Sequence, residues 1–167
     1  SMEAFERVYD FLHLEETIKT PECPTLLSNP KGKVTFSHVS FGYNEQMVFQ
    51  DINFNIYPGE YVALIGLSGV GKSTIGKLIS RCYDAIQGAI LFDDVNIKDM
   101  SLEQLRHLVG TVSQEIYLFN GTIVDNIRYG KLDATREEII EASKLANAHD
   151  FIMETPDGYQ SEIGEHG

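Results

Sequence analysis

Two segments in the first third of the chain alternate apolar and polar side chains. The alternation covers residues 34–41 and 48–56, and the turn-forming residues Gly42, Tyr43 and Asn44 lie between them. Alternation at every second residue places the apolar side chains on one face of a sheet. The pattern predicts two strands joined as a β-hairpin.

Longer apolar runs predict further strands. Residues Tyr61 to Ile65 are apolar without interruption, which is typical of a strand buried on both faces. A glycine-rich loop follows, and then a helical pattern from about Lys72 to Cys82. Ala89 to Phe92 predicts another strand, and Thr111-Val112 a short one.

Capping signals mark two more helices. Ser101-Leu102-Glu103-Gln104 and Thr135-Arg136-Glu137-Glu138 match the capping box, so we expect helices to about Leu108 and Ala148. Apolar positions at helical spacing predict an amphipathic helix over residues 2–14, and residues 149–167 read as a short helical piece followed by loop. A hairpin followed by alternating strands and helices indicates the α/β class.

Composition narrows the class of protein. The chain has 167 residues, enough for one domain, and its net charge of −12 argues against nucleic acid as a partner. No stretch reaches the roughly 18–20 apolar residues of a membrane-spanning helix. Cys23 and Cys82 lack metal-binding spacing, and we expect Cys82 to be buried. Residues 20–33 are rich in turn-forming residues, so the compact domain is predicted to start near Lys33.

The glycine-rich loop carries the main chemical signal. Its residues fit the pattern G-x-x-x-x-G-K-[ST], the Walker A motif: Gly66, Leu67, Ser68, Gly69, Val70, Gly71, Lys72 and Ser73. Glycines let successive backbone N–H groups face a phosphate chain, and a helix N-terminus favours the anion. We expect Lys72 to reach the β- and γ-phosphates of a nucleotide, the Ser73 hydroxyl to bind Mg²⁺, and Thr74 to donate to the α-phosphate.

Further motifs make residues 33–167 resemble the ATP-binding cassette of ABC exporters. Phe41-Gly42-Tyr43 resembles the A-loop, whose tyrosine stacks on adenine, and Val112-Ser113-Gln114-Glu115 resembles the Q-loop. Residues 118–127 resemble the exporter segment that follows the Q-loop, and residues 156–167 resemble the exporter X-loop. The resemblance implies a P-loop NTPase fold of the ABC type: an antiparallel β subdomain, an α/β core and the start of a helical subdomain.

The resemblance also implies cofactors, partners and a location. ATP and Mg²⁺ are the implied ligands, Lys72 and Gln114 the catalytic residues, and Ser73 and Gln114 the metal ligands. Residues 1–32 would be a linker from a preceding membrane domain, and residues 33–167 the N-terminal part of the nucleotide-binding domain. Implied partners are the transmembrane domain of the same transporter and a second nucleotide-binding domain, at the cytoplasmic face of the cell membrane.

Several family motifs do not occur in residues 1–167. These are the Leu-Ser-Gly-Gly-Gln signature, the Walker B strand with its catalytic glutamate, and the switch histidine. We therefore expect these residues alone not to hydrolyse ATP. We also expect the predicted strand Tyr61 to Ile65 to lack neighbours, which favours low stability or self-association.

Two other interpretations remain open, and one local feature is set aside. The chain could be half of a soluble ABC-type ATPase of the DNA-maintenance kind, or a non-catalytic nucleotide-binding module. The acidic pair Asp93-Asp94 is interpreted as a solvated turn at the end of a strand, not as a catalytic dyad.

Overall fold

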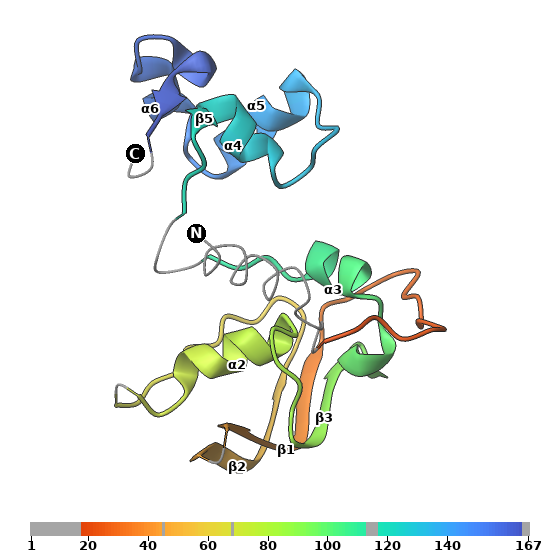
Figure 1. Ribbon diagram of the computed structural model, residues 1–167. Helices are drawn as coiled ribbons and strands as arrows, with labels where there is room; N and C mark the ends of the chain where they lie inside the picture. Colours follow the sequence, from red (N-terminus) through yellow and green to blue (C-terminus); the bar gives the residue numbers. More distant parts are fainter. Residues whose placement is uncertain (1–17, 45, 68, 113–116, 165–167) are drawn as a thin grey trace, which may run out of the picture. The chain divides into compact units, whose positions relative to one another are not determined.

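The computed structural model describes residues 18–44, 46–67, 69–112 and 117–164, and it divides into two compact units. The first comprises Ser1–Val112 and the second Ser113–Gly167. The predicted helix over residues 2–14 lies outside the described residues, as do Ser68 and Gln114. Figure 1 shows the chain coloured along its sequence.

A four-stranded antiparallel sheet is the framework of the first unit. Its order is β2 (Gln46–Ile56), β1 (Val34–Tyr43), β3 (Gln87–Phe92) and β4 (Val95–Asn96). The predicted hairpin is confirmed: Val34 pairs with Ile56, and Tyr43 pairs with Gln46. The first strand continues through Gly42 and Tyr43, so the turn is tighter than the sequence predicts. The Asp93-Asp94 turn is confirmed as well, since it joins β3 to β4.

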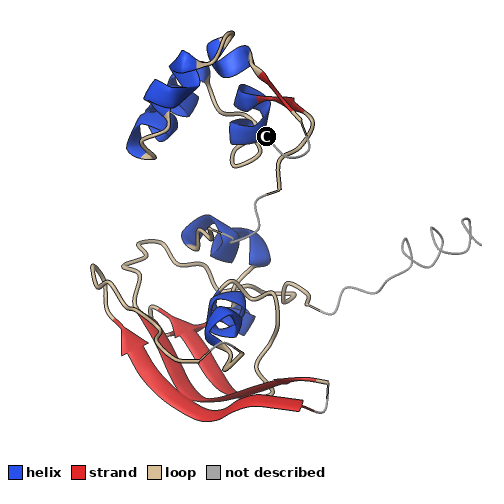
Figure 2. Cartoon of the chain, turned by 90° about the vertical axis from the view of Figure 1, so that its left-hand side faces the viewer, coloured by secondary structure: helices blue, strands red, loops and turns tan. Residues whose placement is uncertain are grey.

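Helix α2 (Lys72–Ile79) covers one face of this sheet, as Figure 2 shows. Its buried Leu78 packs with the inward residues of β1, among them Phe36, Val39 and Phe41. The core therefore uses the apolar residues that the alternating pattern selects, which is the usual way for a half-buried strand to contribute to a domain.

Gly88 permits a close approach between β1 and β3. A Cβ atom added there would lie 2.2 Å from the carbonyl oxygen of His38, and Gly88 has φ +82°. The register between the two strands shifts at the same place, between Ser37 and Ser40. Only glycine fits both the contact and the backbone angle.

Two predicted strands are absent from the described structure. Residues 61–65 belong to no strand or helix, and Tyr61 and Ile65 are 104% and 94% exposed. Thr111-Val112 is also irregular, and Val112 is exposed. A strand buried on both faces needs paired neighbours and covering layers. Among the described residues, no strand pairs with 61–65.

The end of α2 differs from the prediction. The helix ends at Ile79 and not at Cys82, and Cys82 is exposed where we expected it to be buried. The chain turns at Arg81, whose φ is +52°. The turn directs Arg81 inward, to 5% exposure, and leaves Cys82 at the surface.

The turn-rich segment before β1 is hydrogen-bonded to the first unit. The Thr25 N–H donates to the Asp99 carbonyl at 2.7 Å, beside the 3-10 turn η1 (Ile97–Asp99). The Gln104 side chain bonds both the N–H and the carbonyl of Leu27. Gln104 belongs to α3 (Leu102–Leu108), whose predicted Ser101 cap is present. The Gln104 side chain, the second member of that capping box, therefore binds the segment that precedes β1.

Asp93 holds the last residues of the same segment. Its carboxylate accepts hydrogen bonds from the backbone N–H groups of Lys31, Gly32 and Lys33, at 2.6 to 3.2 Å. Burial raises the pKa of Asp93, but these three donors outweigh it, so its pKa lies below the ordinary value. The role of Asp93 is thus to fix the start of β1.

The second unit is mainly helical. It contains β5 (Gly121–Thr122), α4 (Ile123–Arg128), α5 (Arg136–Leu145), α6 (His149–Glu154), the 3-10 turn η2 (Gly158–Gln160) and β6 (Glu162–Ile163). Its core is Val124, Ile139, Ile152 and Tyr159. The short helical piece expected after residue 149 is confirmed as α6, and β6 was not predicted.

Capping boxes start two of these helices. The predicted box at Thr135 and Glu138 is present in full, although α5 ends at Leu145 and not at Ala148. A second box, formed by Thr122 and Asp125, starts α4. The sequence pattern does not indicate this helix, because its acidic residue is Asp where the usual signal has Glu or Gln.

Candidate functional site

The glycine-rich loop leads directly into the N-terminus of α2. Gly71 is the N-cap residue of α2, with φ 92°, and it supplies no side-chain hydrogen bond. A Cβ atom at this position would lie 2.4 Å from Cγ1 of Val48 in β2. Glycine is therefore required twice, for the left-handed backbone and for the close packing against the hairpin. This packing fixes where the loop ends.

Lys72 folds back over the loop that precedes it. Its ammonium group donates hydrogen bonds to the carbonyl oxygens of Gly66 at 2.9 Å and Leu67 at 2.5 Å. These bonds hold the positive charge against the first two residues of the loop. A phosphate chain that bound here would replace the two carbonyl acceptors with charged oxygens, which form stronger hydrogen bonds with an ammonium group.

The first turn of α2 leaves backbone donors available to a ligand. The Thr74 and Ile75 N–H groups donate to the Gly71 carbonyl, at 3.0 and 3.3 Å. The earlier amides of the turn have no partner within the helix, and the helix dipole gives this end partial positive charge. Helices α3, α4 and α5 are capped by the side chains of Ser101, Thr122 and Thr135, respectively. At α2, as at α6, no side chain caps the helix.

Tyr43 lies at the same end of α2. Its hydroxyl shares a hydrogen bond of 3.3 Å with the hydroxyl of Thr74, a buried residue in the first turn of the helix. The Tyr43 ring stands perpendicular to Phe41, with centroids 4.9 Å apart, and the residue is 36% exposed. The structure thus brings the predicted base-stacking tyrosine to the predicted phosphate loop, 31 residues away in sequence.

The residues present fit a nucleoside triphosphate with its magnesium ion. Lys72 and the exposed Ser73 are the first two residues of α2, where the earlier backbone amides have no partner within the helix. No group of three or more His, Cys, Asp or Glu side chains that could hold a metal ion occurs in the part of the chain that the structure describes. Mg²⁺ commonly takes most of its ligands from phosphates and water, with one or two from protein, so Ser73 suits such an ion.

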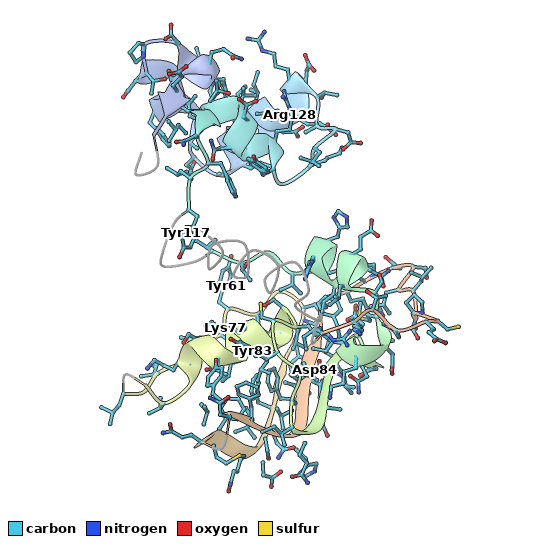
Figure 3. The ribbon with its side chains drawn as sticks, in the orientation of Figure 1. Tyr61, Lys77, Tyr83, Asp84, Tyr117 and Arg128 are labelled. Carbon is cyan, nitrogen blue, oxygen red and sulfur yellow. The ribbon has the colours of Figure 1, made fainter. Side chains whose placement is uncertain are left out.

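One neighbour of Tyr43 is not predicted from the sequence. The ring of Tyr83 lies 5.2 Å from that of Tyr43 and nearly perpendicular to it, at 86°. Tyr83 follows α2 and lies beside the sheet, as Figure 3 shows. Nothing in the sequence pairs two tyrosines forty positions apart, because only the packing of α2 on β1 brings them together.

A cavity elsewhere is separate from these residues. It measures about 570 Å³, belongs to the second unit, and is lined by Arg128, Arg136 and Tyr159 among others. None of the predicted nucleotide-site residues lines it.

Comparison with known proteins identifies the family of the chain. The family model described as ABC transporter matches residues 49–162. The chain belongs to the ABC transporter family. The match begins in β2 and includes the glycine-rich loop, α2 and the elements of the second unit as far as β6.

Relatives point to exporters within this family. A multidrug export ATP-binding/permease protein of Staphylococcus aureus (strain NCTC 8325 / PS 47) is 50% identical over 139 residues, which are 82% of this chain and 24% of that protein. The multidrug export ATP-binding/permease protein YgaD of Bacillus subtilis (strain 168) is 43% identical over 169 residues, which are 100% of this chain and 29% of that protein. The chain thus spans about a quarter of the length of the curated relatives it matches.

A solved structure supports the same assignment. The structure of a bacterial Atm1-family ABC exporter with ATP bound matches 98% of this chain and 29% of that chain, with a TM-score of 0.82 and 40% identity. The predicted α/β fold of a P-loop, ABC-type ATPase and the resemblance to exporter nucleotide-binding domains are thereby confirmed. Within the described residues, no helix is both long enough and apolar enough to cross a bilayer.

Proposed function

We propose that this chain is the ATP-binding part of the motor domain of an exporter. The phosphates bind at the loop from Gly66 to Ser73, and adenine stacks on Tyr43. The observation that carries the proposal is the junction of this loop with α2. There a glycine N-cap leaves the helix amides open, Lys72 stands over the loop, and Tyr43 contacts Thr74.

Each residue has a separate task in this proposal. Lys72 exchanges its two carbonyl acceptors for β- and γ-phosphate oxygens, and the open amides hold the phosphate chain. Thr74 donates to the α-phosphate. Ser73 and Gln114 hold Mg²⁺, and Gln114 also orients the attacking water. The ion neutralises negative charge on the transferring phosphoryl group.

The partners in the proposal are a membrane domain and a second nucleotide-binding domain. The names of the relatives combine ATP-binding and permease functions, which supports a membrane domain in the same polypeptide and a position at the cytoplasmic face of the membrane. The net charge of −12 weighs against a nucleic-acid partner.

We further propose that residues 1–167 bind ATP without turning it over by themselves. They supply Lys72, Ser73 and Gln114, but no motif that provides a general base for the attacking water. A phosphate-release assay with saturating Mg-ATP is expected to stay at the level of buffer. A rate on the order of 1 s⁻¹, within the usual range for enzymes, contradicts this.

Binding is tested by calorimetric titration with a non-hydrolysable ATP analogue. Lys72→Ala removes the ammonium from the phosphates, and we expect an affinity loss of about ten- to a hundredfold, since hydrogen bonds of charged groups contribute about 1.5–3 kcal/mol. Lys77→Ala is the matched control, because Lys77 lies in the last turn of the same helix and is exposed. Equal affinities for the two variants contradict a phosphate site at this loop.

A further inference from the structure

Three aromatic rings, those of Phe41, Tyr43 and Tyr83, form one cluster beside α2. The centroid distances are 4.9 Å between Phe41 and Tyr43, 5.2 Å between Tyr43 and Tyr83, and 5.6 Å between Phe41 and Tyr83. Phe41 is buried at 3% exposure and belongs to the core. Tyr43 and Tyr83 are partly open to solvent, at 36% and 40%. A fixed core ring therefore supports two rings at the surface.

The backbone on both sides of Tyr83 is held in place. The Arg81 guanidinium is buried and donates to the Asp84 carboxylate at 3.0 Å and to the carbonyl oxygens of Ile97 and Met100. Past Asp84, the Ile86 N–H donates to the Ser40 carbonyl of β1 at 3.0 Å. Tyr83 is thus carried by a short loop fixed to the core, and its ring is pre-organised against Tyr43.

Contacts of this kind restrict how the Tyr43 ring can turn. Tyr83 and Phe41 both stand nearly perpendicular to it, at 86° and 88°. Its hydroxyl is held as well, by the hydrogen bond to Thr74. A ring that is ordered before a ligand arrives loses less conformational entropy on binding, so the ligand binds more tightly.

We propose that Tyr83 is a positioning residue, which holds the Tyr43 ring in the orientation that receives the base of the nucleotide. This rests on the proposed function, because it takes Tyr43 as the adenine-stacking residue. Tyr83 does not contact the phosphates in this arrangement. Its loss therefore weakens binding of the base and leaves binding of the triphosphate chain unchanged.

The test compares two ligands on four variants by calorimetry. The ligands are a non-hydrolysable ATP analogue and inorganic tripolyphosphate, which has no base. Tyr83→Ala is expected to weaken the analogue about three- to tenfold, the range of aromatic pair energies, with tripolyphosphate unchanged. Tyr83→Phe keeps the ring and is expected to bind both ligands as the wild type does. An affinity loss shared by the two ligands is the result of a disturbed fold and overturns the proposal, as does an unchanged affinity for both.

A double substitution separates positioning from direct contact. If Tyr83 acts through Tyr43, the Tyr43→Ala, Tyr83→Ala double variant binds the analogue as weakly as Tyr43→Ala alone, because coupled residues are not additive. Additive losses mean that Tyr83 touches the base itself, which overturns a positioning role. If Tyr43→Ala alone leaves the analogue's affinity unchanged, the base does not rest on Tyr43, and the proposed adenine site fails together with this inference.

Discussion

Helix α2 in the first unit and helix α5 in the second begin in opposite ways. At α5 the Thr135 hydroxyl accepts from the Glu138 N–H at 3.2 Å, and the Glu138 carboxylate accepts from the Thr135 N–H at 2.8 Å. At α2 the N-cap residue is Gly71, which has no side chain to offer. The first arrangement satisfies the helix end internally, and the second leaves its donors for an anion. The start of α5 is therefore stabilised by its own side chains, and the start of α2 is the one at which we propose that phosphates bind.

The two helix starts also differ in the residues that surround them. Gly71 is pressed against Val48, so the uncapped end of α2 is held by a contact with the β-hairpin. At α5 a nearby lysine also contacts the cap, since the Lys131 ammonium donates to the Glu138 carboxylate at 2.7 Å. The start of α2 therefore depends on a contact with a residue distant in sequence, whereas the start of α5 depends on residues close in sequence.

Among the variants of the two helix starts, Gly71→Ala is expected to have the largest effect. A positive φ costs a non-glycine residue about 1–2 kcal/mol, and overpacking against Val48 costs about 1–3 kcal/mol more. We expect the free energy of unfolding of the first unit to fall by their sum, and ATP binding to be lost. Urea unfolding and analogue titration measure the two effects.

Gly76→Ala is the matched control in the same helix. A Cβ atom at Gly76 meets nothing within 4 Å. Alanine is the better helix former by about 0.8–1.0 kcal/mol, so this variant should be more stable than the wild type. If both variants destabilise the protein equally, the packing account of Gly71 is wrong.

A smaller effect is expected at the other helix. Thr135→Ala removes the hydroxyl that accepts from Glu138, and an N-cap of this kind contributes about 1 kcal/mol. Faster amide exchange should be confined to α5 and its neighbours in the second unit, with the affinity for the ATP analogue unchanged. Thr135→Gly should cost only a few tenths of a kcal/mol, since glycine is a tolerated N-cap. A loss of ATP binding in Thr135→Ala would mean that the two helix starts are not independent.

The smallest effect concerns pH. The hydrogen bond from Lys131, with that from the Thr135 N–H, holds the pKa of Glu138 below its ordinary value of 4.5. A lowered pKa in the folded state means that this carboxylate stabilises the helix above its ordinary pKa, and that the contribution is lost as the pH falls through the folded-state value. The protection factors of the α5 amides, which compare the measured exchange rate with the intrinsic rate at the same pH, should therefore fall on acidification below that point.

Lys131→Met is the variant that checks this cause. It removes the ammonium, so an NMR titration of Glu138 should show a pKa closer to its ordinary value. The acid-induced loss of protection in α5 should then begin at a higher pH than in the wild type. An unshifted titration curve would show that Lys131 does not hold the pKa down.

Some features were predictable because neighbours in sequence create them. The alternating residues of β1 and β2 pair with each other across a tight turn, so the hairpin needs no distant partner. The Thr135 box closes within four residues, and the loop from Gly66 to Ser73 depends on residue types at fixed spacing. These local patterns were also sufficient to indicate the ABC family and to predict a phosphate site.

Other features depend on what lies across the molecule. An apolar run such as 61–65 becomes a strand only beside paired neighbours, and Cys82 is exposed because the chain turns at Arg81. Gln104 could have closed its own capping box, but it bonds Leu27. The proposed phosphate site follows from the sequence alone, because backbone curvature and helix starts are local properties. Tertiary structure alone decided that Tyr43 meets Thr74 and Tyr83, because ring contacts depend on the packing of α2 against the sheet.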